Sequence, residues 1–143
     1  MTFSFGQSQH ERIEIDVQRY ERSPVGNYDD DNWLTVRISV RAGGFRGEVE
    51  AAILTGELAA FLEPLRTLYD TLQSEVEFVT MEDQIRLRLI GNGKGHIKLL
   101  GEVTDQSGIG NQLHFTLRFD QSELAESIRE LEKVTSQFPV RAT

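Results

Sequence analysis

Cysteine is absent from the chain, and this absence removes several kinds of chemistry together. Without a thiol there is no disulfide, no thiolate nucleophile and no cysteine-ligated metal. A chain without cysteine also fits a reducing compartment, so we expect a cytoplasmic protein. At 143 residues it has the size of a typical domain, and we interpret residues 1–143 as one α+β domain.

Long hydrophobic runs are also missing. Nowhere does the sequence carry the roughly 18 consecutive apolar residues that a membrane-spanning helix needs, so no such helix is expected. The first residues, Met1 to Gln9, contain neither a basic start nor an apolar stretch. A secretory signal is therefore not predicted.

Positive charge is scarce. The chain has 15 Lys and Arg against 23 Asp and Glu, which gives a formal net charge of −8. Such a field repels nucleic acid and anionic membranes, so direct binding to either is not expected. A basic protein partner would be attracted, although solubility alone also explains an acidic composition.

Motifs for catalysis are missing as well. The segment Gly91–His96 is rich in glycine, but alternating residues of a strand follow it rather than the helix that a phosphate-binding loop requires. A glycine-rich hairpin explains it better, because glycine supplies the positive φ of tight turns. No serine lies in a nucleophile-elbow motif. We therefore predict no catalytic residue, and we do not expect an enzyme.

Metal and cofactor sites are not predicted either. His10, His96 and His114 show no recognised ligand spacing. Asp29, Asp30 and Asp31 are adjacent, whereas calcium loops place their ligands at alternate positions. Solvated loop charge is the simpler interpretation of these aspartates. The alternative is a charged contact for a basic partner, with the following Trp33 as its aromatic anchor.

Alternation of apolar and polar residues dominates the chain and predicts half-buried strands in an antiparallel sheet. Gly43-Gly44, Met81–Asp83 and Asn92-Gly93 separate these runs and predict turns. We count about seven strands, with Thr2–Phe5 as a further candidate. The alternating positions include Ile13, Ile15, Val17, Leu34, Val36, Ile38, Val40, Val49, Ala51, Ile53, Ile85, Leu87 and Leu89.

Two segments change to helical spacing, and the prediction is an α+β fold with two amphipathic helices on one face of the sheet. Thr55 is a candidate N-cap of the first helix, and Asp120 or Ser122 of the second. Pro64 should kink the first helix or begin its second half. The two apolar stripes are Leu58, Phe61, Leu62, Leu65, Leu68 and Leu72, then Leu124, Ile128, Leu131, Val134 and Phe138.

A shift of 66 residues aligns the two strand-to-helix junctions with each other. Glu57-Leu58-Ala59 then falls on Glu123-Leu124-Ala125, and Val49, Ala51 and Ile53 fall on apolar positions of the last strand. This alignment indicates either an internal repeat or the shared pattern of any amphipathic junction, and the sequence leaves both open.

A surface remains as the candidate site. The predicted sheet leaves one polar face uncovered, where Arg37 and Arg41 precede Glu48 and Glu50 and can pair with them across strands. The same polar side carries His114 and Arg118 on the last strand. The residues that we predict to bind a partner are Asp29, Asp30, Asp31, Trp33, Glu48, Glu50, His114 and Arg118.

Several short motifs together resemble a known family. Asp31-Asn32-Trp33-Leu34 leads into Gly44–Gly47, and Gly93–Ile97 and Gly108–Leu113 follow later. This pattern is similar to the WapI-type immunity proteins of bacteria, and the resemblance spans roughly Asp31 to Leu131. It implies a protein that neutralises, inside the producing cell, the toxic nuclease domain of a large cell-surface protein by stoichiometric binding.

Three hypotheses follow. The first is an immunity or other protein-binding module, whose acidic field would suit a basic nuclease toxin. The second is a small-molecule-binding protein or enzyme with a polar pocket near the glycine-rich hairpin, formed by His96, Asp105 and His114. The third is a subunit whose sheet edges pair in a homodimer.

Overall fold

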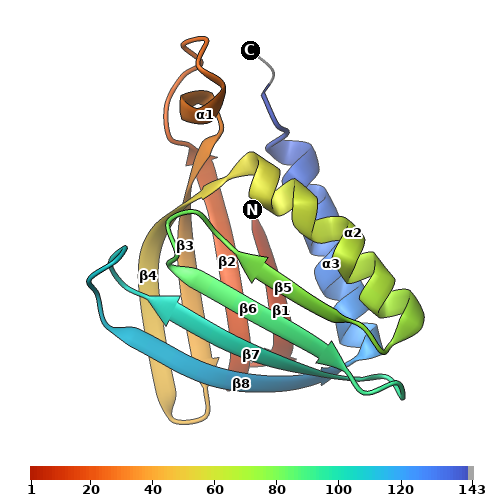
Figure 1. The fold of residues 1–143 in the computed structure, drawn as a ribbon. Helices are drawn as coiled ribbons and strands as arrows, with labels where there is room; N and C mark the ends of the chain where they lie inside the picture. The colour runs from red at the N-terminus through yellow and green to blue at the C-terminus, as the bar shows by residue number, and fades with distance from the viewer. Residues whose placement is uncertain (142–143) are drawn as a thin grey trace.

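The computed structural model describes residues 1–141, which form a single body of strands flanked by helices (Figure 1). Eight strands and three helices lie in this part of the chain. In chain order they are β1 Thr2–Ser8, β2 Glu11–Tyr20, α1 Tyr28–Asp31, β3 Trp33–Ala42, β4 Phe45–Leu54, α2 Thr55–Thr71, β5 Glu75–Val79, β6 Ile85–Gly91, β7 His96–Thr104, β8 Gln112–Asp120 and α3 Gln121–Gln137.

The predicted α+β class is confirmed, but the strands form two sheets rather than a single sheet of seven. Sheet A has the order β1-β2-β3-β4 and sheet B the order β5-β6-β7-β8, and both are antiparallel throughout. Alternation predicts strands but not their partition. The division falls at α2, which lies between β4 and β5 in the chain.

The apolar faces of the two sheets meet in one core. Strand β8 lies across β1, β2 and β3, and the helices close the side of the molecule where β1 and β5 lie (Figure 1). Phe61 of α2 stacks on Phe78 of β5 with ring centroids 4.4 Å apart, and Phe5 of β1 contacts both Phe61 and Phe119. These contacts join elements from both halves of the chain, so neither sheet has a core of its own.

Apart from the short helix α1, which lies only in the first half, the two halves of the chain share one order of elements. Each half contains four consecutive antiparallel strands followed by a helix. The helix bounds Thr55–Thr71 and Gln121–Gln137 differ by the same 66 residues that align the two junctions in sequence. The shared order favours an internal repeat, but the 66-residue shift aligns the two strand-to-helix junctions and does not align β1 and β2 with β5 and β6.

Helix termini differ in part from the prediction. Asp120 caps α3 as expected, since its side chain accepts a hydrogen bond from the Glu123 backbone N–H. Helix α2 begins at Thr55 itself, after Leu54 in extended conformation, and Glu57 reaches back to the Leu54 N–H. Pro64 lies inside α2, which runs without a break from Thr55 to Thr71, so it does not begin a second helix.

The free edge of β1 is covered by α3. Glu130 accepts hydrogen bonds from the backbone N–H and the hydroxyl of Ser4, at 3.1 and 3.0 Å. The Ser127 hydroxyl donates to the Ser4 carbonyl from the same helix. An uncovered strand edge invites pairing with another chain. These contacts remove part of β1 from such pairing.

Candidate functional site

The outer face of sheet A carries its charges in rows that run across the strands. In one row Arg37 lies between Asp16 and Glu50, following the register of β2, β3 and β4. Arg37 contacts Glu50 at 3.1 Å and Glu48 at 3.5 Å. The hydrogen bond to Glu50 and the charge of Glu48 raise the pKa of Arg37 above its ordinary value. The predicted pairing of Arg37 with these acids is confirmed.

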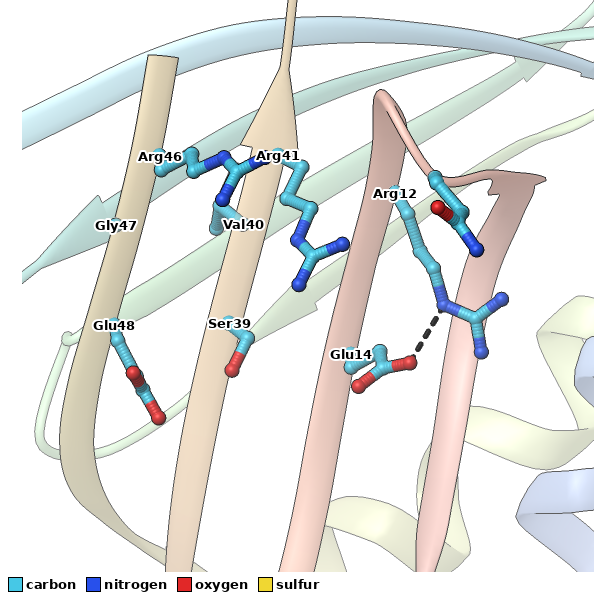
Figure 2. A pocket seen from close by; sticks show the side chains of 9 residues that line it. Arg12, Glu14, Ser39, Val40, Arg41, Arg46, Gly47 and Glu48 are labelled. Atoms are coloured by element: carbon cyan, nitrogen blue, oxygen red, sulfur yellow. Dashed lines mark ion pairs between the residues drawn. The ribbon is translucent and has the colours of Figure 1, made fainter.

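The predicted pairing of Arg41 with an acid is wrong. Arg41 lies directly opposite Arg46 on β4 and Arg12 on β2, so three arginines form one row (Figure 2). The tight turn at Gly43-Gly44 sets this register, because it places Ala42 opposite Phe45 and Arg41 opposite Arg46. A shallow depression of about 650 Å³ lies on this row.

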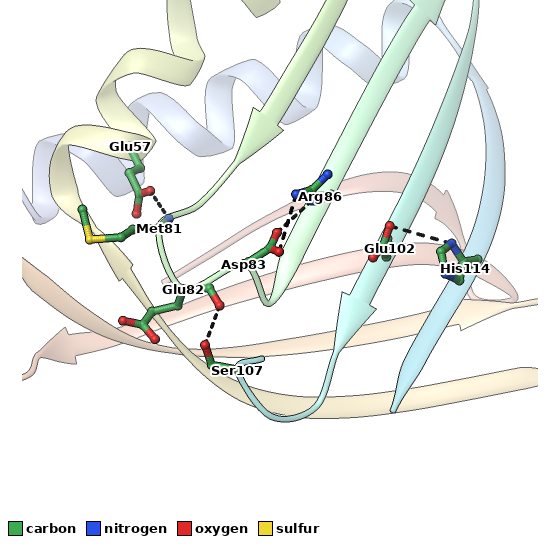
Figure 3. Close-up of polar contacts among 8 residues, drawn as sticks. All are labelled: Glu57, Met81, Glu82, Asp83, Arg86, Glu102, Ser107 and His114. Carbon is green, nitrogen blue, oxygen red and sulfur yellow. Dashed lines mark hydrogen bonds and ion pairs between the residues drawn. The ribbon is translucent and has the colours of Figure 1, made fainter. Parts of the chain in front are cut away.

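The outer face of sheet B is a second polar surface. Glu75 of β5 pairs with Arg88 of β6 at 2.8 Å. His114 of β8 lies 3.9 Å from Glu102 of β7, and its side chain is exposed (Figure 3). The pair of Glu75 and Arg88 stabilises this sheet modestly, as opposite charges across strands do. Lys98 and Arg118 of the same face, by contrast, lie directly opposite each other as like charges.

The β5–β6 turn, which carries Glu82 and Asp83, lies at one end of sheet B beside the β7–β8 loop (Figure 3). Glu57 of α2 accepts a hydrogen bond from the Met81 N–H, and the Ser107 hydroxyl donates to the Glu82 carbonyl. These bonds join the β5–β6 turn to α2 and to the β7–β8 loop. Met81 and Ile109 are 70% and 85% exposed at these loops. Sequence reasoning did not find this surface, because turns carry no periodic signal.

The three consecutive aspartates have different environments. Asp29 is exposed and Asp30 is half-buried, both on the short helix α1. Asp31 is only 1% exposed, and its carboxylate accepts hydrogen bonds from the N–H groups of Val25 and Gly26 at 2.8 and 3.0 Å. Its interpretation as solvated loop charge is therefore wrong, since the carboxylate holds the preceding loop in place.

The other predicted partner-binding residues are dispersed. Trp33 is half-buried at the start of β3, opposite Leu54. Glu48 and Glu50 lie on the outer face of sheet A, whereas His114 and Arg118 lie on sheet B. The eight residues do not form one continuous surface. Glu48 and Glu50 share a face with the row of three arginines, and the alternation of β3 places Trp33 on the same face at the other end of the strand.

The pocket predicted from His96, Asp105 and His114 is not formed. His96 begins β7 and pairs with Asp120, while Asp105 follows the other end of that strand. Asp105 instead accepts a hydrogen bond from the Asn111 N–H within its own loop. His114 pairs with Glu102, so the three residues lie apart along the hairpin.

A different depression of about 650 Å³ adjoins the glycine-rich hairpin. Hydrogen bonds from the Ser122 hydroxyl and the Glu123 N–H, with the charge of His96, lower the pKa of Asp120. Burial and the charge of Asp120 raise the pKa of Glu123. The polar residues that line this depression are Asn92, His96, Lys98, Arg118, Asp120 and Glu123.

Two kinds of feature are absent from residues 1–141. No helix in this range is long and apolar enough to cross a membrane. No group of three or more His, Asp or Glu side chains, among the residues that the structure describes, is placed to hold a metal ion.

Comparison with protein families identifies the chain. Residues 4–139 match the family described as Immunity protein WapI-like family. The chain belongs to the WapI-like immunity protein family. The match extends beyond both ends of the segment that carries the resemblance in sequence, and it includes both sheets together with α2 and α3.

Other comparisons of this WapI-like protein concern its fold. No curated protein matches it. Among solved structures it is similar to one titled "Structure of the plant transcriptional regulator PBF-2", with a TM-score of 0.54 and 11% sequence identity. The alignment covers 96% of this chain and 81% of that chain. At this identity the likeness concerns the arrangement of strands and helices alone.

Proposed function

We propose that the chain is an immunity protein that binds the toxin domain made by the same cell and blocks it in the cytoplasm. Family membership over residues 4–139 is the observation that carries this proposal. The partner that we expect is a basic nuclease domain, because the net charge of −8 would accelerate its association. Binding in one-to-one proportion needs no chemical step by this chain.

The outer face of sheet A is the docking surface that we propose for this partner. Its charges lie on paired strands, so they are held at fixed spacings before binding. Such preorganisation reduces the side-chain and loop ordering that association costs. Glu48 and Glu50 are the charged residues of the sequence prediction that belong to this surface.

Co-expression tests the proposal. The chain is produced together with the toxin domain encoded beside it, and growth of the host is measured. We expect full protection and co-purification of the two proteins as one complex. We also expect an association rate that falls steeply with salt, since the attraction is electrostatic. Growth arrest with both proteins present in soluble form would contradict the proposal.

Binding of a small anionic ligand is a second candidate function. The depression beside the glycine-rich hairpin favours it, because Lys98 and Arg118 converge there with two carboxyl groups of shifted pKa, Asp120 and Glu123. Saturable chemical-shift changes confined to this depression, in titrations of the free protein with small anions, would favour this candidate over the first.

A further inference from the structure

The arginine row of sheet A, which consists of Arg12, Arg41 and Arg46, works against the stability of the sheet. Like charges directly opposite one another destabilise an antiparallel pair, whereas opposite charges stabilise it. The row of Asp16, Arg37 and Glu50 on the same face follows the stabilising rule. Sheet stability alone therefore explains the row around Arg37 but not the arginine row.

Neutralisation of the arginine row is incomplete. Arg12 Nε lies 2.7 Å from Glu14 Oε1, so this arginine has a counter-charge. Arg41 and Arg46 form no ion pair with the part of the chain that the structure describes, and both side chains are exposed. Two guanidinium groups on neighbouring strands thus present free donors to an incoming molecule.

The surroundings of the row limit what can bind there. The depression over it contains Ser39, whose short side chain lies between Glu14 and Glu48 in the next row of the face (Figure 2). Carboxylates are well suited to the planar fork of donors on arginine. A ligand with negative charge over the arginines must carry neutral or positive groups over Glu14 and Glu48.

We propose that the arginine row receives a short acidic segment of the protein partner, with two or more Asp or Glu side chains on Arg41 and Arg46. This inference rests on the proposed function and names a feature of the same partner. A basic toxin domain with one local acidic segment matches both rows of the face. A polynucleotide does not, because its continuous negative charge would lie against Glu14, Glu48 and the overall field.

The arginine row would determine which partner binds, and in which orientation, more than how fast the partner is attracted. Overall charge brings the two proteins together, while the arginines fix the register in which they dock. A basic surface without the acidic segment would place like charges against Arg41 and Arg46. Such a mismatch rejects the wrong partner.

Charge reversal on two faces tests the proposal. The Arg41→Glu/Arg46→Glu variant is compared with Lys98→Glu/Arg118→Glu, which reverses a cross-strand pair of like charge on sheet B and changes the net charge equally. Affinity for the toxin domain encoded beside the chain should fall at least tenfold for the first variant, beyond any loss in the second. Equal affinities of the two variants would overturn the proposal.

Two measurements on the free protein keep the test independent of the toxin. Arg41→Glu should raise the melting temperature by about 2 °C, because it places opposite charges across the strands. This rise would also show that the variant folds. A fall in the melting temperature would contradict the account of the arginine row.

The second measurement uses a hexaglutamate peptide and a single-stranded oligouridylate as probes. The peptide should shift the Nε–Hε resonances of Arg41 and Arg46 but not that of Arg118. If the peptide binds to the arginine row but the chain forms no complex with the toxin domain, the proposed function is refuted, whereas the inference that the row binds acidic segments is supported. Tighter binding of the RNA than of the peptide, or no shift at all, would overturn the inference.

Discussion

The buried side chain of Asn32 ties the loop before β3 to distant parts of the chain. The Asn32 amide oxygen accepts from the Thr55 hydroxyl at 2.6 Å and from the Arg141 N–H at 2.7 Å. Its amide nitrogen donates to the carbonyls of Tyr28 and Arg141 at 2.7 and 3.0 Å. A single side chain thus joins α1, the start of α2 and the C-terminal segment.

Substitution of Asn32 tests this role. Asn32→Ala should lower the free energy of unfolding by about 2–3 kcal/mol, because the Thr55 hydroxyl and the Arg141 backbone lose buried partners. Asn111→Ala is the control, since that amide is exposed, and we expect a change of about 0.5 kcal/mol or less. Urea denaturation measures both, and similar losses would refute the role of Asn32.

The sequence predicts a residue's partner where alternation within one strand pair determines it. It does not predict the environment of a residue that depends on a tertiary contact. Arg37 and its acids follow from alternation in a single hairpin. The opposition of Arg41 and Arg46 depends on the register that the tight turn at Gly43-Gly44 sets, and alternation alone does not give that register. Burial of Asp31 depends on how the loop folds back over it, and three adjacent aspartates carry no signal of that.

At the scale of elements, the cap of α3 combines stability with a sensitivity to acid. The Asp120 carboxylate accepts from the Ser122 hydroxyl at 2.7 Å and from the Glu123 N–H at 3.0 Å. These bonds lower the pKa of Asp120 in the folded protein. The charged carboxylate therefore stabilises the fold at pH values above its ordinary pKa, and this stabilisation is lost as the pH falls through the lowered pKa. The ionisation of Glu123 has the opposite effect on stability, because its pKa is raised in the folded protein.

An Asp120→Asn variant tests this cap. Asparagine retains capping ability but cannot titrate, so the variant should be less stable than the wild type near pH 6. The difference should shrink as the pH falls below about 4, where the wild type begins to lose the contribution of its charged carboxylate. Melting temperatures between about pH 2 and 6 measure this. A constant difference across that range would contradict the assigned role.

The elements themselves were largely predictable, and their assembly was not. Alternation around Ile13–Val17 and Leu34–Val40 identifies strands, and the stripes of α2 and α3 identify helices. Periodicity does not say which strands pair across the break made by α2. Helix α1, at four residues, is too short to show helical spacing.

At the scale of the whole molecule, two sheets share one core and each keeps an outer polar face. The fold is similar to that of a plant transcriptional regulator at 11% identity, so the architecture alone does not determine what the surfaces bind. Family membership and net charge carry the proposed function. The homodimer hypothesis stays a prediction, and the contacts of α3 with Ser4 already occupy part of one sheet edge.

The proposed function depends on one claim, that the chain acts by occupying its partner rather than by altering it. Titration of the active toxin domain with increasing amounts of the purified chain, with nuclease activity as the readout, tests this claim most directly. The account predicts a linear loss of activity that ends at one chain per toxin, with activity restored when the complex is separated under denaturing conditions. Complete inactivation by a small fraction of an equivalent, or no loss at a large excess, would contradict it.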